Sequence, residues 1–447
     1  MSGGRRIAAS ASRKDAMKPA LLAISLLCAA AALSAAEPPT LVAVKAGRLI
    51  DPKSGSVSSG TVIVIENGRI KAVGPSIAVP AGAQVIDLSA LTVLPGLMDC
   101  HTHLVGDYVH DKDPLSDVKK TAADRAFESV PNARATLEAG FTTVRDVGTY
   151  RAFIDVAMRD AIARGDFPGP RMFVAGAYLT ITGGGGTMST GLAPDIGLPW
   201  DLKFGIADGV DQVRQRVRAI AEHDVDVIKI LATGAFLTHG SNPHAVEYTY
   251  DEIRAAVEEA THKGLKVAAH AHSAEGIKLA VKAGVASIEH GTYLDDEGIR
   301  LMKEHGTYLV ADIYDAEWIR QGAQAGYPSD FAEKQPEADE IQRQAFRKAA
   351  QVGVKIAFGT DVSNFPHGLN ARQFAWQVKY GQTPMEAIRS ATVSASELIG
   401  RGNDAGSLEP GKRADLIAVK GDPLSDVRVL ENVSFVMKDG KVYKDAR

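Results

Sequence analysis

The segment LPGLMDCHTHL, residues 94–104, brings an apolar run to a Pro-Gly pair and ends on two histidines, His101 and His103. Residues at positions i and i+2 of a strand point to the same face. Two imidazoles side by side are typical of ligands for one metal ion. A lone His-x-His also arises by chance, so the metal interpretation depends on what the rest of the chain places near this strand end.

Short apolar runs with β-strand character recur through the middle of the chain. They alternate with amphipathic segments such as 208–223, 250–264 and 273–284, several of which end on glycine, a common helix stop. This alternation predicts a parallel sheet, and the nearly continuous Val, Ile and Ala runs predict strands buried on both faces. The eight runs are 92–103, 141–148, 171–176, 225–234, 266–272, 286–292, 307–313 and 354–361.

Eight strand–helix units over about 300 residues favour an α/β fold, a (β/α)8 TIM barrel, whose usual size is about 250 residues. A doubly wound open sheet is the alternative. Both flanks instead alternate short β runs with glycine turns, and together they predict one small β-sandwich domain built from the two chain ends. We expect the domain limits to be 37–94 with 402–447 for the small β domain, and 95–401 for the barrel.

The composition is that of a soluble globular protein: of 447 residues, 45% are hydrophobic and 23% charged, with a formal net charge of −4. A chain of this length can bury a large core. There is no surplus of basic residues, so we expect no nucleic-acid partner.

The N-terminal region has the pattern of a secretory signal peptide. In MKPALLAISLLCAAAALSAAEPPT, residues 17–40, a lysine precedes an apolar run too short to span a bilayer, followed by small residues. We expect a signal peptide at 1–36 with cleavage before Glu37, and hence an exported, periplasmic or secreted protein that is not membrane-bound in its mature form. An uncleaved anchor is the alternative, and translation starts at Met1 or Met17. Cleavage removes Cys28 and leaves Cys100 alone, without a partner for an intramolecular disulfide.

Polar residues fall at five of the eight predicted strand ends, where TIM barrels place their chemistry. Each has an ordinary explanation by itself: a lysine can extend to solvent, a histidine can be satisfied in a core and an aspartate can cap a helix. Together they predict a metal site at one opening of the barrel. The residues are His101, His103, Lys229, His270, His272, His290 and Asp361.

Lys229 is the unusual member of this set, because it lies in the apolar strand DVIKILATG. Burial lowers the pKa of a lysine and favours its neutral amine. A neutral amine can react with CO2 to form a carbamate, an anion with two oxygens that could bridge two cations. The sequence therefore allows a carbamate on Lys229 at the centre of the site.

Several motifs together resemble the amidohydrolase superfamily of metal-dependent hydrolases, from about residue 41 to the end. They are PGLMDCHTHL, the KI of the fourth strand, AAHAH, SIEHGTYL, FGTD and GSLEPGKRADLIAV. The chain is most similar to the branch with imidazolonepropionase-like proteins, Xaa-Pro and Xaa-Lys/Arg metallo-carboxypeptidases and ochratoxin-hydrolysing amidohydrolases.

The resemblance implies two divalent metal ions, expected to be zinc. His101, His103 and Asp361 would bind the more buried ion, and carbamylated Lys229 would bridge to a second ion bound by His270 and His290. Of this pair, His270 aligns with the family's ligand, so His272 is expected to orient the substrate or a group next to the ligands; the alternative is that His272 is the ligand. Relatives often carry a histidine where this chain has Gly185, in ITGGGGTMST, which puts specificity or activity in doubt.

The resemblance also implies hydrolysis, by a metal-bridging hydroxide, of the C-terminal amide bond of a dipeptide or N-acyl amino acid, ochratoxin A included. Asp361 would pass a proton from the bridging water to the leaving nitrogen. The expected partners are a small-molecule or short-peptide substrate and further copies of the chain in a homo-oligomer. The alternatives are a cyclic-amide hydrolase or deaminase, and a periplasmic binding protein or pseudoenzyme.

Overall fold

The structure is a computed structural model that describes residues 41–447, except 108, 110, 112, 114–115 and 323–328. The predicted signal peptide, 1–36, lies outside the described residues. Within the described part of the chain, no helix combines the length and apolar character needed to cross a membrane. Cys100 is a free, buried thiol.

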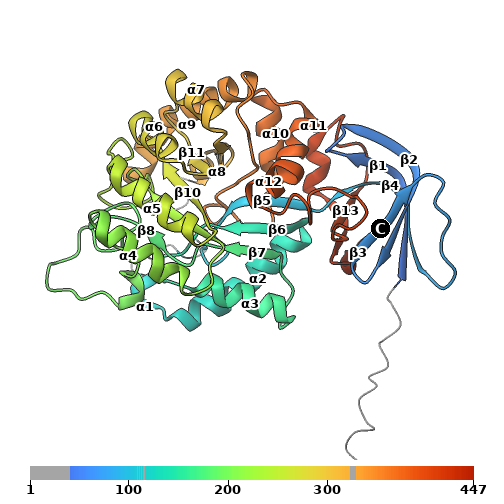
Figure 1. The fold of residues 1–447 in the computed structure, drawn as a ribbon, viewed down its shortest axis with the longest axis horizontal. Coiled ribbons are helices and arrows are strands. Elements are labelled where there is room, and N and C mark those ends of the chain that lie inside the picture. Colours follow the sequence, from blue (N-terminus) through green and yellow to red (C-terminus); the bar gives the residue numbers. More distant parts are fainter. Residues whose placement is uncertain (1–40, 108, 110, 112, 114–115, 323–328) are drawn as a thin grey trace, which may run out of the picture. The chain divides into compact units, whose positions relative to one another are not determined.

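Two parallel sheets form the α/β part of the molecule, with helices around them (Figure 1). The three-stranded sheet has the order β5-β6-β7 and the five-stranded sheet the order β12-β11-β10-β9-β8. Seven of the eight predicted runs contain a strand, which confirms the alternating α/β pattern. The two sheets also contain β8 (Tyr178–Leu179), which lies in none of the predicted runs. The other strands are β5 (Leu97–Thr102), β6 (Phe141–Asp146), β7 (Arg171–Val174), β9 (Val227–Leu231), β10 (Lys266–Ala271), β11 (Ser287–His290) and β12 (Tyr308–Val310).

The three amphipathic segments named in the sequence form helices α4, α5 and α6, and their apolar faces pack on β9 to β11. Local signals fix their ends: Thr249 and Glu252 form a capping box on α5, and Ser273 caps α6. The helices are α1 (Ser116–Lys119), α2 (Ala122–Glu138), α3 (Ile154–Arg164), α4 (Val210–Ala221), α5 (Tyr250–His262), α6 (Ala274–Ala283), α7 (Asp296–His305), α8 (Asp315–Gly322), α9 (Ser329–Gln351), α10 (Arg372–Lys379), α11 (Pro384–Arg389) and α12 (Ala395–Leu398). Short helical turns are η1 (Trp200–Leu202), η3 (Ser390–Ser394) and η4 (Val427–Glu431).

The eighth predicted run, 354–361, differs from the prediction because it forms no regular strand. Its backbone still bonds on both sides: Leu309 N donates to Lys355 O at 2.8 Å, and Cys100 N donates to Phe358 O at 2.8 Å. At Gly359 the carbonyl oxygen accepts a hydrogen bond from the side chain of Gln373, at 2.6 Å, where a regular strand would bond to the backbone of its neighbour. A Cβ at Gly359 would lie 2.2 Å from Val310 Cγ1, so only glycine fits this close approach.

A separate seven-stranded mixed sheet combines both flanks of the chain, in the order β15-β14-β13-β4-β1-β2-β3. Strand β4 joins the two flanks, since it pairs parallel with β1 and antiparallel with β13. The predicted domain limits stay predictions. The strands are β1 (Leu41–Asp51), β2 (Ser56–Glu66), β3 (Arg69–Gly74), β4 (Gln84–Pro95), β13 (Leu416–Val419), β14 (Val433–Lys438) and β15 (Lys441–Asp445).

One apolar core joins this sheet to the start of the parallel strands. Leu94 and Ile417 of the sheet share a buried cluster with Leu97, Phe141 and other apolar residues. Leu97 and Phe141 are the first residues of β5 and β6. The sheet therefore packs at the amino ends of these strands and leaves their carboxyl ends free to carry polar side chains.

Candidate metal centre

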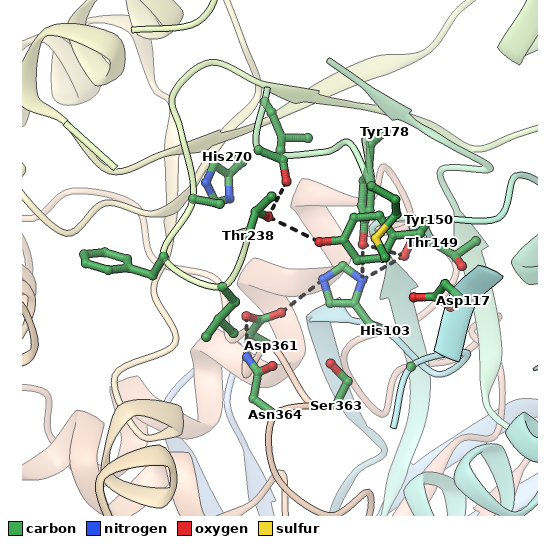
Figure 2. A pocket seen from close by; sticks show the side chains of 18 of the residues that line it. His103, Asp117, Thr149, Tyr150, Tyr178, Thr238, His270, Asp361, Ser363 and Asn364 are labelled. Carbon is green, nitrogen blue, oxygen red and sulfur yellow. Dashed lines mark hydrogen bonds and ion pairs between the residues drawn. The ribbon is translucent and has the colours of Figure 1, made fainter. Parts of the chain in front are cut away.

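The carboxyl end of β5 presents His101 and His103 to Asp361. His103 Nε2 lies 3.0 Å from Asp361 Oδ1 (Figure 2). His101 Nε2 lies 3.4 Å from the same oxygen. On the far side of each ring, Nδ1 has its own partner: Glu289 Oε2 at 2.9 Å for His101 and Gly148 O at 2.8 Å for His103. Both rings therefore direct Nε2 toward one carboxylate.

In this half of the site, formed by His101, His103 and Asp361, the imidazoles and the carboxylate influence each other's pKa. Burial by itself would raise the pKa of Asp361, but the neighbouring imidazoles of His101 and His103 hold it well below its usual value. Burial likewise works against a charged His103, yet its bond to Asp361 raises the pKa of that imidazole. Asp361 has a left-handed backbone, with φ of 55°, which is uncommon outside glycine and found where a site constrains the chain.

The ends of β10 and β11 bring three more histidines together. Their ring centroids lie 4.5 Å apart for His270 and His272, 4.6 Å for His270 and His290, and 4.8 Å for His272 and His290. Burial, with the charge of the neighbouring histidines, lowers the pKa of His270 and His272 well below 6.5. These two rings are therefore neutral at neutral pH, the form in which imidazole binds metals.

Hydrogen bonds fix the direction of each ring in this second group. His290 Nδ1 lies 2.7 Å from Asp312 Oδ2, and His272 Nδ1 lies 2.8 Å from Thr292 Oγ1. His270 uses its other nitrogen, since Nε2 lies 3.2 Å from the Gly234 carbonyl oxygen. Each imidazole thus keeps one ring nitrogen available to a ligand.

Lys229, in β9, is only 2% exposed and lines the same cavity as the histidines. Burial lowers the pKa of its amine to about 8, against the raising effect of Glu289 and Asp361. Near physiological pH a minor fraction of this lysine is therefore neutral, far more than of an exposed lysine, and the neutral form is the reactive form of an amine.

The donor set fits a divalent cation. The available ligand atoms of His270, His272 and His290 all lie within 4.8 Å of one another, as do those of His101, His290 and Asp361. His101 Nε2 is buried and has no hydrogen-bond partner, an arrangement that costs free energy unless another group meets that nitrogen. Imidazole nitrogens with a carboxylate are ligands that zinc prefers. All seven side chains predicted from the sequence line one cavity, while their individual roles stay predictions.

The cavity in front of these residues has a volume of about 760 Å³, within the usual range for small-molecule sites. Its lining includes the apolar side chains of Met188, Leu192, Phe236 and Leu237, and Tyr150 also lines the cavity. This combination suits a substrate with an apolar group and a polar bond placed near the histidines.

Gly185 belongs to the cavity wall. Its N donates to Glu247 Oε1 at 2.7 Å, and its O accepts from Thr238 Oγ1 at 2.5 Å. A Cβ at this position would lie 3.0 Å from the Ala235 Cβ, so a histidine here requires the neighbouring loop to shift.

Several residues that orient the histidines were missed in the sequence. Glu289 and Asp312 bond to His101 and His290, and Asn364 Nδ2 donates to Asp361 Oδ2 at 2.9 Å (Figure 2). Asp312 lies just past the seventh strand, so the same rule of polar residues at strand ends would have found it. Glu289 carried no such signal, because it lies within a strand.

The amidohydrolase family model matches residues 92–443, most of the chain. The chain belongs to the amidohydrolase family. Over 419 residues this amidohydrolase is 32% identical to an ochratoxinase from Aspergillus niger, covering 89% of this chain and 86% of the relative. It is 27% identical to an imidazolonepropionase from Geobacillus kaustophilus, covering 90% and 97% of the two chains.

Among solved structures, this amidohydrolase is similar to a Xaa-Pro dipeptidase crystallised with methionine in its active site. The sequence identity is 39% and the TM-score 0.86, covering 90% of this chain and all of the other. The family is one of metal-dependent hydrolases, and its prolidase-like and ochratoxinase members agree with the site described above. The protein is therefore an enzyme that hydrolyses amide bonds.

Proposed function

We propose that this protein is a binuclear metal-dependent amidohydrolase that cleaves the C-terminal amide bond of dipeptides or N-acyl amino acids. The observation that carries the proposal is the set of seven side chains of metal-binding type that line one cavity, with His101 Nε2 buried and lacking a hydrogen-bond partner. The similarity to a Xaa-Pro dipeptidase and to an ochratoxinase supports this substrate class.

The fold behind this proposal is a closed (β/α)8 barrel. In this arrangement segment 354–361 stands as the eighth strand between β12 and β5, which its backbone hydrogen bonds to Leu309 and Cys100 support. The other junction runs through β7 and β8, because β7 pairs with β6 and β8 pairs with β9. Closure would bring all the strand ends to one opening, as in other TIM-barrel enzymes.

Two zinc ions are the proposed cofactors. His101, His103 and Asp361 would hold one ion, and His270 and His290 the other, with a carbamate on Lys229 between them. The buried, partly neutral amine of Lys229 supports the carbamate. When bound, such ions supply a Lewis acid and lower the pKa of water from 15.7 toward about 7.

Asp361 is the residue that we expect to move a proton. Its lowered pKa keeps the carboxylate ionised and able to accept a proton on Oδ1, while the bond from Asn364 orients Oδ2. Delivery of that proton to the leaving nitrogen assists expulsion of the amine. His272 faces the cavity with Nε2 available, which suits a hydrogen bond to the substrate.

The apolar residues that line the cavity support a hydrophobic or aromatic acyl group, and ochratoxin A is one candidate substrate. Hydrolysis of a cyclic amide is the second candidate, favoured by the similarity to an imidazolonepropionase. The two differ in their products, since only the first releases a free amino acid.

Amino-acid release from dipeptides and N-acyl amino acids ending in Phe, Pro, Lys, Arg or Leu tests the proposal. The assay uses zinc-loaded protein with bicarbonate, with and without chelator. Release that chelator abolishes is the expected result, and the preferred terminal residue then defines the specificity. Metal-loaded protein that releases no amino acid from any of them, but opens cyclic amides, would replace the proposal by the second candidate.

We also propose that the protein is exported after cleavage before Glu37 and assembles as a homo-oligomer. The sequence of residues 17–40 supports the export. N-terminal sequencing of protein recovered from a bacterial periplasm tests the cleavage, and light scattering of the purified protein tests the assembly.

A further inference from the structure

The carboxylate of Glu289 bonds to the ring of His101, and none of the roles proposed above involves it. Glu289 precedes His290 in β11 and is fully buried. Its Oε2 lies 2.9 Å from His101 Nδ1. Its Oε1 accepts hydrogen bonds from Arg145 Nη2 at 2.8 Å and from Ser287 Oγ at 2.5 Å. A buried carboxylate with three such partners has a fixed position.

Arg145 keeps this carboxylate charged and in place. It also donates from Nε to Cys100 O at 2.6 Å, and from Nη1 to Ser287 Oγ at 2.9 Å, so that it ties β6 to β5 and β11. Because a guanidinium stays protonated, its buried ion pair with Glu289 Oε1 at 2.8 Å favours the ionised carboxylate.

An ionised carboxylate only accepts hydrogen bonds, so the proton of a neutral His101 must sit on Nδ1. Nε2 then carries a lone pair, and this is the buried nitrogen without a hydrogen-bond partner, 3.4 Å from Asp361 Oδ1. We propose that Glu289 is a positioning residue, which fixes the tautomer and direction of His101 so that Nε2 can bind a cation. The inference rests on the proposed metal centre.

A parallel arrangement serves the other half of the site. Asp312 Oδ2 lies 2.7 Å from His290 Nδ1, and Gln342 Nε2 donates to Asp312 Oδ1 at 2.8 Å. Strand β11 therefore contributes to both halves of the site. Glu289 orients His101, a ligand proposed for the first ion, and the next residue, His290, is a ligand proposed for the second ion.

The test is equilibrium dialysis of the wild type and its variants against chelator-buffered zinc, with bound metal counted by mass spectrometry. We expect Glu289→Gln to weaken one of the two zinc sites by about 10–100-fold, as is usual when such a partner of a metal ligand is removed. Asp312→Asn should weaken the other site. His103→Ala and His270→Ala show which binding phase belongs to which half.

Two comparisons separate positioning from damage to the core. Glu259→Gln removes another buried carboxylate paired with an arginine, Arg218, between α4 and α5, and should leave both zinc sites unchanged. Glu289→Gln should weaken zinc binding in the wild-type background but add nothing in a His101→Ala background. If Glu289→Gln does not fold, Glu289→Asp is measured instead, since it keeps the charge beside Arg145 but is one methylene shorter.

Equal weakening of both zinc sites by the Glu289 variant, or no weakening, would overturn the inference. So would a further loss in the His101→Ala background, because Glu289 would then act through another group. A wild-type protein that binds no zinc would instead contradict the proposed function, so the two failures are distinguishable.

Discussion

The two halves of the candidate metal centre differ in how they handle charge. On the β5 side, His101 and His103 face Asp361 across 3.4 and 3.0 Å, and this carboxylate keeps an unusually low pKa. On the side of β10 and β11, His272 stacks with His290 and His270 meets both rings edge-on, and the pKa of His270 and of His272 is lowered well below 6.5. The first half carries its own anion, whereas the second consists of imidazoles.

This difference explains what Lys229 can contribute. In the second half the carboxylate of Asp312 bonds to Nδ1 of His290 rather than to the nitrogen left for a cation, so a cation there would be bound by neutral imidazoles and keep most of its charge in a buried site. A carbamate on Lys229 would supply a negative charge directly to this half. The two halves therefore obtain their negative charge from different residues, Asp361 and Lys229, and variants of these residues should affect the two halves differently.

The largest effect is expected on the anionic side. Asp361→Asn removes the group that holds the proton, so kcat should fall by about 10²–10⁴-fold, the usual contribution of a general acid–base group. Metal content should change far less than kcat. Steady-state kinetics with metal analysis on the same sample checks this, and near-normal turnover would contradict the role of Asp361.

A second prediction concerns the ion that each half binds. His103→Ala and His270→Ala each remove one ligand from a different half, so each variant should retain about one of two zinc ions at limiting metal. Lys229→Met should lower the affinity of the imidazole half more than that of the half with Asp361. Metal analysis after dialysis measures both, and equal losses at the two halves would remove the distinction between them.

The role of His272 is a sharper test of the imidazole half. If His272 hydrogen-bonds the substrate, His272→Asn should lower kcat/KM by about 10–100-fold. This is the loss expected when a hydrogen bond to a charged group, which contributes about 1.5–3 kcal/mol, is removed. Both zinc ions should remain bound. Loss of one zinc ion in this variant would make His272 the ligand in place of His270.

The smallest effect contrasts Asp361 with Asp155, a buried carboxyl whose pKa is raised rather than lowered. Burial raises the pKa of Asp155 to about 6, above its unfolded value of 3.8. The folded state therefore binds more protons in this interval, and stability should fall as pH rises from about 4 to about 6. Asp155→Asn should reduce the fall measured between pH 5 and pH 8 by about 1 kcal/mol. Urea unfolding of metal-free protein at both pH values checks this, and an unchanged slope would contradict it.

Much of the site could be predicted from the sequence, because strand ends of a parallel sheet converge. That rule is local, and it found His101, His103, Lys229, His270, His290 and Asp361 from their places in apolar runs. Lys229 was expected to be buried for the same reason, and it is 2% exposed.

The supporting contacts could not be predicted in this way. The hydrogen bond between His101 and Glu289 joins β5 to β11, and the hydrogen bonds of Arg145 join β6 to both strands. These contacts depend on how the strands pack, which the spacing of apolar residues in the sequence does not predict. The eighth run was expected to be a strand, but Gln373 from α10 bonds to its backbone instead. Such side chains are ordinary in sequence and acquire their role only in the folded chain.

A crystal structure of the protein loaded with zinc in bicarbonate, with anomalous data at the zinc edge, tests the account most directly. We expect two anomalous peaks, one beside His101, His103 and Asp361 and one beside His270 and His290, with carbamate density on Lys229 between them. A single peak beside a bare lysine would contradict the account.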